Sequence, residues 1–126
     1  MRVVYFIFSL AIISLGIIHI AATPHFFPHL TAGAVWFASG GLAIVLTGAL
    51  NLLNRAYGEI AFGLRLVCVG TNIVMTCFAF LAGSASRASA GQFVLIIGLL
   101  AGATLLSLLP GARLNRNRPQ VDDRRT

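Results

Sequence analysis

The chain has 126 residues, of which 58% are hydrophobic and only 10% are charged, and its formal net charge is +6 at pH 7. A soluble domain of this length needs more charged side chains to cover its surface, so the composition excludes an ordinary soluble fold. The positively charged side chains are all arginine and cluster beside apolar segments. Arginines in these places are typical of a membrane protein, in which they set the orientation of the spans, and we expect no binding of nucleic acid.

Long segments without charge set the number of helices. No Asp, Glu, Lys or Arg lies between Arg2 and Arg55, between Arg65 and Arg87, or between Arg87 and Arg113. A helix crosses the hydrocarbon core of a bilayer with about 20 apolar residues. The first segment therefore has room for two spans and a turn, and each of the others for one. The sequence predicts an all-α integral membrane protein, built as a four-transmembrane-helix bundle.

The first span is predicted at residues 3–22. Arg2 followed by an apolar run resembles a secretory signal peptide, but the run is longer than the usual apolar region of about 7–15 residues. We therefore expect this span to be retained. Residues 23–29 are predicted as a loop, because Pro24 and Pro28 disfavour a regular helix.

The other spans are predicted at residues 30–53, 60–82 and 92–109, with a transmembrane domain over residues 1–111 in all. Residues 112–126 are polar and rich in arginine, which is typical of a disordered basic tail.

The arginines predict the orientation. With four spans, Arg2, Arg55 and the tail arginines fall on one side of the membrane, and the opposite side holds only Arg87. The positive-inside rule then places both termini in the cytoplasm of a bacterial-type inner membrane, with the loop between the first two spans outside. Tyr5 is expected near the cytoplasmic interface, as part of an aromatic belt.

Small and polar residues are expected to join the helices, because lipid provides no hydrophobic drive for their association. The predicted contact faces carry pairs of glycines, namely Gly41 with Gly48, Gly63 with Gly70, and Gly98 with Gly102. The residues expected to hydrogen-bond between helices are Ser9, Ser14, Thr47, Asn51 and Asn72. Asn72 is also a candidate for a polar site near the middle of the membrane. Cys68 and Cys77 are expected to be buried, unreactive thiols.

Three histidines are the candidate metal ligands. His19 lies near the outer end of the first span, and His25 and His29 follow in the loop. Imidazole binds Zn and Cu well, so the three side chains form a candidate site for a transition metal. The spacing is not a specific metal motif, and the alternative is that the histidines are ordinary helix-end and loop residues.

Arg65 lies a short distance inside the third span. It is expected to extend its guanidinium to the cytoplasmic interface, beside Glu59. The alternative is an anion or lipid-headgroup site made with Asn51, Asn54 and Arg55. The tail arginines are likewise candidates for binding anionic headgroups.

Two functions remain open. The first is a non-enzymatic accessory or structural subunit, acting as a homo-oligomer or within a larger membrane complex. The second is a small transporter or metal-handling protein that uses the three histidines and a polar path through Asn72 toward Asn51 and Arg65. Catalysis is not expected, because the predicted topology places every acidic residue opposite the histidines.

Overall fold

The structure is a computed structural model that describes residues 1–85 and 89–109. These residues form four helices, α1 (Arg2–Phe26), α2 (Ala32–Tyr57), α3 (Phe62–Ala85) and α4 (Ala90–Leu108). Each helix is long and apolar enough to cross a membrane. The prediction of an all-helical protein with four helices of membrane length is therefore confirmed. The predicted tail and Arg87 lie outside the described residues.

Side chains cap the start of two helices. The Thr31 hydroxyl accepts a hydrogen bond from the backbone N–H of Ala34 at the start of α2. At the start of α4, Ser89 and Gln92 form a reciprocal capping box. Such caps satisfy N–H groups that the helix itself leaves without a partner, and these groups are costly to leave unpaired in an apolar medium.

The predicted loop at residues 23–29 is wrong in its first half, because α1 continues through Pro24 to Phe26. Proline removes one backbone donor, but near the end of a helix only a single hydrogen bond is lost. The backbone N–H of Phe27 still donates to the Thr23 carbonyl at 2.9 Å, which closes the last turn. The break between the first two helices therefore falls at residues 27–31.

Helices α1 and α2 form a tight antiparallel hairpin because glycines let their backbones approach. A Cβ atom built at Gly16 would lie 2.7 Å from the Gly41 carbonyl oxygen, and one at Gly41 would lie 3.0 Å from the Gly16 carbonyl oxygen. A Cβ atom at Gly48 would lie 2.9 Å from the Ser9 carbonyl oxygen. The prediction that Gly41 and Gly48 lie at a helix contact is confirmed.

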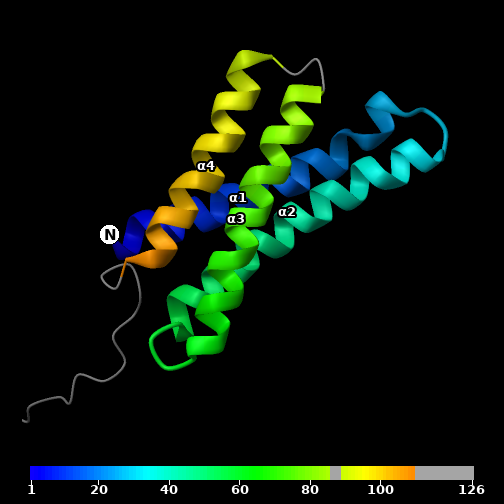
Figure 1. Cartoon of the computed structure of the whole chain (residues 1–126). Coiled ribbons are helices and arrows are strands. Elements are labelled where there is room, and N and C mark those ends of the chain that lie inside the picture. Colours follow the sequence, from blue (N-terminus) through cyan, green and yellow to red (C-terminus); the bar gives the residue numbers. More distant parts are fainter. Residues whose placement is uncertain (86–88, 110–126) are drawn as a thin grey trace, which may run out of the picture.

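Helices α3 and α4 form a second hairpin, which crosses the first (Figure 1). The two hairpins lie against each other near the amino end of α1 and diverge toward the α1–α2 and α3–α4 connections. Ile12 of α1 packs with Leu100 and Ala103 of α4 in a small apolar core at the crossing. The two hairpins are therefore joined over a limited part of their length, whereas the helices within each hairpin stay close together.

The other predicted glycine contacts are only partly present. Gly102 of α4 lies against the Phe8 ring of α1, but open space lies beside Gly63, Gly70 and Gly98. Among residues 1–85 and 89–109, the prediction that these three glycines pack against another helix is wrong. In a membrane, the open positions face lipid or another protein.

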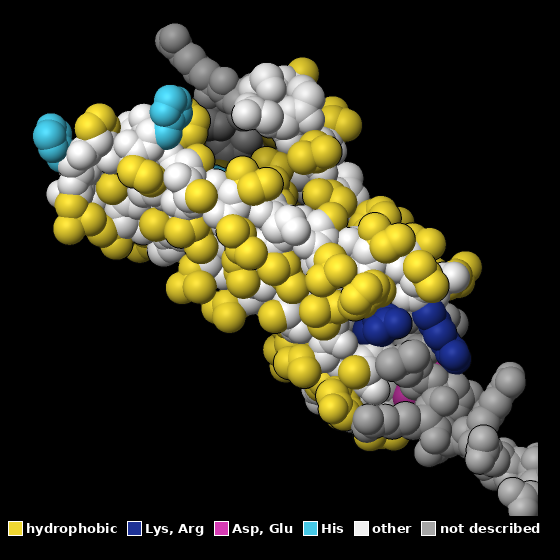
Figure 2. All heavy atoms as spheres, turned by 180° about the vertical axis from the view of Figure 1, so that it is seen from behind, with side chains coloured by type: hydrophobic (Ala, Val, Ile, Leu, Met, Phe, Trp, Pro, Cys, Tyr) yellow, Lys and Arg dark blue, Asp and Glu magenta, His cyan; other side chains and the backbone are white. Residues whose placement is uncertain are grey.

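Apolar side chains cover most of the surface between the ends of the molecule. Figure 2 shows them along the length of one face, with histidines at one end and arginine side chains nearer the other. Large apolar residues are exposed on all four helices, as illustrated by Ile18 at 65%, Leu46 at 60%, Val74 at 65% and Leu105 at 65%. This distribution suits contact with hydrocarbon and not with water.

Candidate functional site

Five polar or polarisable side chains meet where the two hairpins cross. They come from α1, α2 and α3, and each is completely buried: Tyr5, Asn51, Asn54, Cys68 and Asn72. We call these five residues the polar cluster. Amide, phenol and thiol groups are uncharged at neutral pH, so the cluster suits an apolar medium better than ionised groups would.

The centre of the polar cluster is a reciprocal pair of amides. Asn51 Nδ2 of α2 donates to Asn72 Oδ1 of α3 at 2.8 Å, and Asn72 Nδ2 donates back to Asn51 Oδ1 at 2.9 Å. Asn51 Nδ2 also donates to the Thr47 carbonyl oxygen at 2.8 Å. The pair joins one hairpin to the other and confirms the predicted hydrogen bonding of Asn51 and Asn72 between helices.

Tyr5 extends the polar cluster to α1. Its hydroxyl donates to Asn51 Oδ1 at 2.8 Å and accepts from Asn54 Nδ2 at 3.0 Å. The predicted place of Tyr5 in an interfacial aromatic belt is therefore wrong, because the ring lies inside the bundle. A buried tyrosine needs a partner for its hydroxyl, and the amides of α2 supply two.

Cys68 lies on the same side of α3 as Asn72, one helical turn away. Its sulfur is 3.5 Å from Asn51 Oδ1 and 3.8 Å from the Tyr5 hydroxyl. The expectation that Cys68 is buried is confirmed. The same expectation for Cys77 is wrong, because Cys77 is exposed on the surface of α3. The cluster thus places a thiol among hydrogen-bonding groups.

Asn54 has one atom that the polar cluster does not satisfy. Its side-chain oxygen, Oδ1, is buried and has no hydrogen-bond partner among the described residues. Oδ1 faces Gly58, where a side chain would collide with it. The glycine after α2 therefore provides the space that the Asn54 amide occupies.

The helical spacing of these residues explains how they meet, and this spacing is the feature of the sequence from which the polar cluster could be predicted. Thr47, Asn51 and Asn54 recur at intervals of four and three along α2, and Cys68 and Asn72 are four apart on α3. Such spacing places side chains on one helix face. Ser9 and Thr47 are buried on the same faces, but they donate to carbonyl oxygens of their own helices. Ser14, also expected to bond between helices, is exposed.

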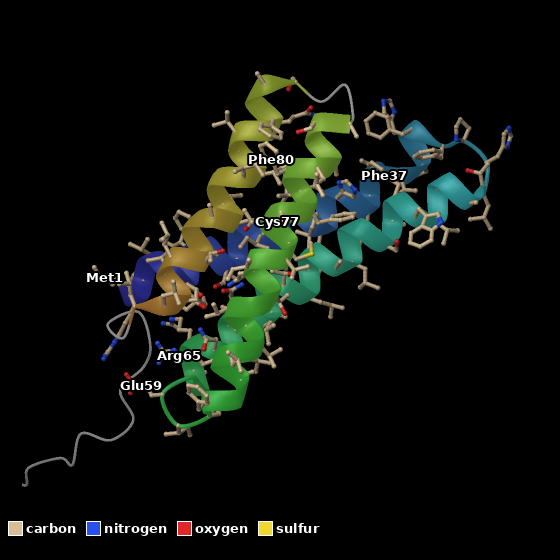
Figure 3. The ribbon with its side chains drawn as sticks, in the orientation of Figure 1. Met1, Phe37, Glu59, Arg65, Cys77 and Phe80 are labelled. Atoms are coloured by element: carbon tan, nitrogen blue, oxygen red, sulfur yellow. The ribbon has the colours of Figure 1, made fainter. Side chains whose placement is uncertain are left out.

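The arginines of the candidate site lie outside the polar cluster. Arg55 Nε donates to the Arg2 carbonyl oxygen at 3.1 Å, and Arg65 Nη2 donates to the Leu108 carbonyl oxygen at 3.4 Å. Arg65 and Glu59 lie at the same end of the molecule (Figure 3). The structure therefore brings Asn51, Asn54 and Asn72 together but leaves both arginines at the surface.

The three histidines lie at the opposite end. His19 stacks on the Phe37 ring of α2 with ring centroids 3.9 Å apart, and His25 makes an edge contact with Phe26. Within residues 1–85 and 89–109, no group of three or more His, Cys, Asp or Glu side chains is placed to hold a metal. Binding of Zn or Cu by His19, His25 and His29 stays a prediction, which metal analysis of the purified protein can test.

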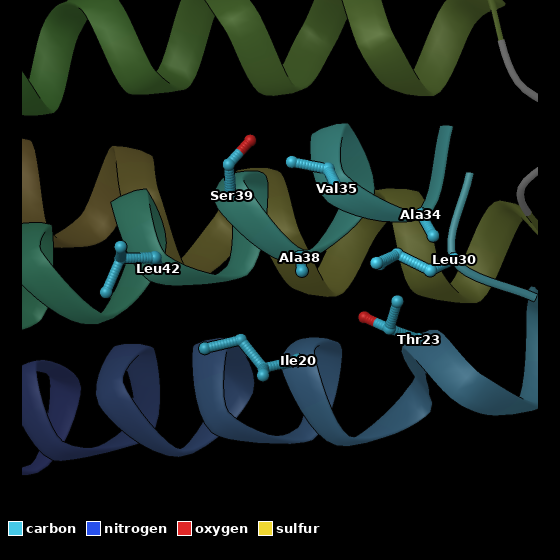
Figure 4. Close-up of a pocket in the computed structure, with 8 residues that line it drawn as sticks. All are labelled: Ile20, Thr23, Leu30, Ala34, Val35, Ala38, Ser39 and Leu42. Carbon is cyan, nitrogen blue, oxygen red and sulfur yellow. The ribbon is translucent and has the colours of Figure 1, made fainter. Parts of the chain in front are cut away.

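An apolar groove opens between α1 and α2 near the histidine end. It has a volume of about 440 Å³, and it is lined by Ile20, Thr23, Leu30, Ala34, Val35, Ala38, Ser39 and Leu42 (Figure 4). The lining offers little besides carbon atoms. In a bilayer such a groove suits a hydrocarbon chain.

Comparison with known proteins gives no match, since no family model, curated protein or solved structure matches the chain. The functional proposal therefore rests on the polar cluster, the apolar surface and the distribution of charge.

Proposed function

We infer that this chain is a multi-pass integral membrane protein of a bacterial-type inner membrane and acts as a non-enzymatic accessory or structural subunit. One observation carries the proposal. The polar side chains of the three helices α1, α2 and α3 bond to one another at the hairpin crossing, whereas the outward faces are apolar. Polar groups arranged in this way join helices in lipid.

The charge distribution supports the orientation with both termini in the cytoplasm. Arg2, Arg55 and Arg65 lie at one end of the bundle, where hydrogen bonds join Arg55 to the start of α1 and Arg65 to the end of α4. The positive-inside rule places that end in the cytoplasm. The tail arginines would then lie beside anionic headgroups of the cytoplasmic leaflet.

Reporter fusions test the insertion and orientation. We expect green fluorescent protein fused after residue 111 to fluoresce, and alkaline phosphatase fused within residues 27–31 to be active, because the first reporter works in the cytoplasm and the second outside it. The protein should also remain in the membrane pellet after alkaline carbonate extraction. Active phosphatase fused after residue 111 would contradict the orientation, and release by carbonate would contradict membrane insertion.

The outer face of α3 supports assembly into a homo-oligomer. Gly63, Gly70 and Cys77 are spaced seven apart on this helix, and all three are exposed. Glycines let helices approach closely in lipid, where van der Waals contact replaces the hydrophobic drive. A second copy of the chain packed along this face would bring its Cys77 thiol near the first.

Oxidative cross-linking tests this assembly with the native thiols. We expect copper–phenanthroline treatment of native membranes to give a disulfide-linked dimer through Cys77, because Cys68 is buried. Cys77→Ser should abolish the dimer and Cys68→Ser should leave it. Gly70→Leu should weaken it by blocking close approach, while Leu46→Phe on the exposed side of α2 serves as the control. A dimer that survives Cys77→Ser, or equal yields from wild type and Gly70→Leu, would contradict assembly through α3.

A second candidate function is the small transporter with a polar path through Asn72 toward Asn51 and Arg65. The buried Asn54 Oδ1 atom favours it, because this oxygen lies in the same polar cluster and has no hydrogen-bond partner among the described residues. Proton flux into proteoliposomes, followed with the internal dye pyranine under a potassium diffusion potential, separates the two functions. A subunit without transport activity should give the flux of protein-free vesicles. Flux above that level which Asn54→Leu abolishes, without loss of folding, would favour transport of protons.

A further inference from the structure

The three described arginines form a basic surface where the ends of the helices meet. Arg2 lies in the first turn of α1, Arg55 in the last turn of α2 and Arg65 in the first turn of α3. No acidic residue lies in the first turn of α1 or α3. The carboxyl ends of α2 and α4 lie at this same end, so their helix dipoles offset those of α1 and α3. The positive charge of this end therefore comes from the three arginine side chains, against one carboxylate among the described residues, that of Glu59.

The Arg55 guanidinium is held in place by two contacts. Its Nε donates to the Arg2 carbonyl oxygen, and its Cζ lies 4.9 Å from the centroid of the Phe6 ring. A guanidinium carries five N–H donors, of which Nε supplies one. Within the described residues, the Arg55 guanidinium donates one hydrogen bond, from Nε to the Arg2 carbonyl oxygen. Its two Nη groups are therefore available to donate hydrogen bonds to a ligand.

Aromatic rings are exposed at this end of the molecule. Phe6, whose ring lies under the Arg55 guanidinium, is 38% exposed. Phe62, the first residue of α3, is 73% exposed. A free anion in water gains nothing from these rings, but the acyl chains of a phospholipid would lie against them while its phosphate meets the arginines. Arginine forms paired, charge-assisted hydrogen bonds with phosphate oxygens.

We propose that Arg55, together with Arg2 and Arg65, binds the headgroup phosphate of an anionic phospholipid in the cytoplasmic leaflet. The site differs from the predicted one, because Asn51 and Asn54 are fully buried and bonded within the polar cluster, where a headgroup cannot reach them. The inference rests on the proposed insertion in the membrane. The proposed lipid site lies on the helices themselves and is separate from any binding of headgroups by the tail arginines.

Native mass spectrometry of the full chain in detergent tests the site with phosphatidylglycerol and phosphatidylcholine as probes. We expect the wild-type protein to retain phosphatidylglycerol in preference to phosphatidylcholine. Arg55→Gln and Arg65→Gln should each weaken phosphatidylglycerol binding on the order of fivefold. Arg55→Lys should restore part of it, since the charge remains but the paired hydrogen bonds are lost. Excess inorganic phosphate should not compete.

Arg87→Gln is the matched control, because it removes the same charge from the connection between α3 and α4. Equal loss in Arg87→Gln and Arg55→Gln would overturn the proposal in favour of general charge attraction. Unchanged binding in Arg55→Gln, or competition by inorganic phosphate, would overturn it as well. If circular dichroism shows that Arg55→Gln does not fold, Arg65→Gln decides alone, with unchanged binding overturning the site. Carbonate extraction distinguishes failure of the lipid site from failure of membrane insertion. A protein that resists extraction but shows no preference for phosphatidylglycerol contradicts the lipid site and leaves membrane insertion standing.

Discussion

Asn51→Leu is expected to lower the free energy of unfolding by about 2–3 kcal/mol. Asn51 contacts Tyr5 of α1 and both Cys68 and Asn72 of α3. Leucine has a similar size but no polar atoms, so the Tyr5 hydroxyl and the Asn72 amide would stay buried with fewer partners. Unfolding of the purified protein in mixed micelles by added sodium dodecyl sulfate, followed by circular dichroism, measures the loss.

Ser39→Ala is the control for this substitution. Ser39 is exposed on the same helix, and its hydroxyl donates to the Trp36 carbonyl within that helix at 2.8 Å. Removing it should change the stability by less than about 0.5 kcal/mol. An Asn51→Leu protein as stable as Ser39→Ala would show that the polar cluster contributes nothing to the bundle.

Gly16→Ala is expected to lower the free energy of unfolding by about 2 kcal/mol, although alanine is the better helix former. The new Cβ atom would lie 2.7 Å from both the Gly41 carbonyl oxygen and the Val45 backbone nitrogen. Backbone atoms cannot rotate away as side chains do, so α1 and α2 would have to separate. The same unfolding experiment measures the effect.

Gly70→Ala makes the same chemical change at a position where no atom of the described residues lies within 4 Å of the new Cβ atom. It should leave the stability of the monomer unchanged or raise it by up to about 1 kcal/mol through helix propensity. If Gly16→Ala and Gly70→Ala have equal effects, the close approach of α1 and α2 is not what holds the hairpin together.

The existence of the four helices could be predicted because apolar length alone determines them. From Arg2 to Arg55 the absence of charge leaves room for two spans, and α1 and α2 occupy that segment. The end of α1 was less predictable. Pro24 disfavours a helix interior but is tolerated close to a helix end, and the sequence does not mark which of the two applies.

The residues of the polar cluster were predictable in part. Asn51 and Asn72 stand out because amides are rare and costly within an apolar span, so each had to find a partner. Tyr5 did not stand out, since a tyrosine near the end of a span serves equally well at the membrane interface. Only the crossing of the hairpins, which no local pattern encodes, places its hydroxyl between Asn51 and Asn54.

Glycine spacing alone was also ambiguous. Gly41 and Gly48 have the same separation as Gly63 and Gly70, yet among the described helices only the first pair contacts another helix. Spacing identifies a face on which close approach is possible. Which partner approaches, and whether it belongs to the same chain, depends on the rest of the fold.

A double-mutant cycle between Asn51 and Asn72 measures whether the buried polar cluster joins the two hairpins. The free energy of unfolding would be measured in the same mixed micelles for wild type, Asn51→Leu, Asn72→Leu and the double variant. We expect a coupling of about 1–2 kcal/mol, because either single substitution already breaks the reciprocal amide pair. Additive losses, with no coupling, would contradict it and mean that the two amides do not hold the hairpins together.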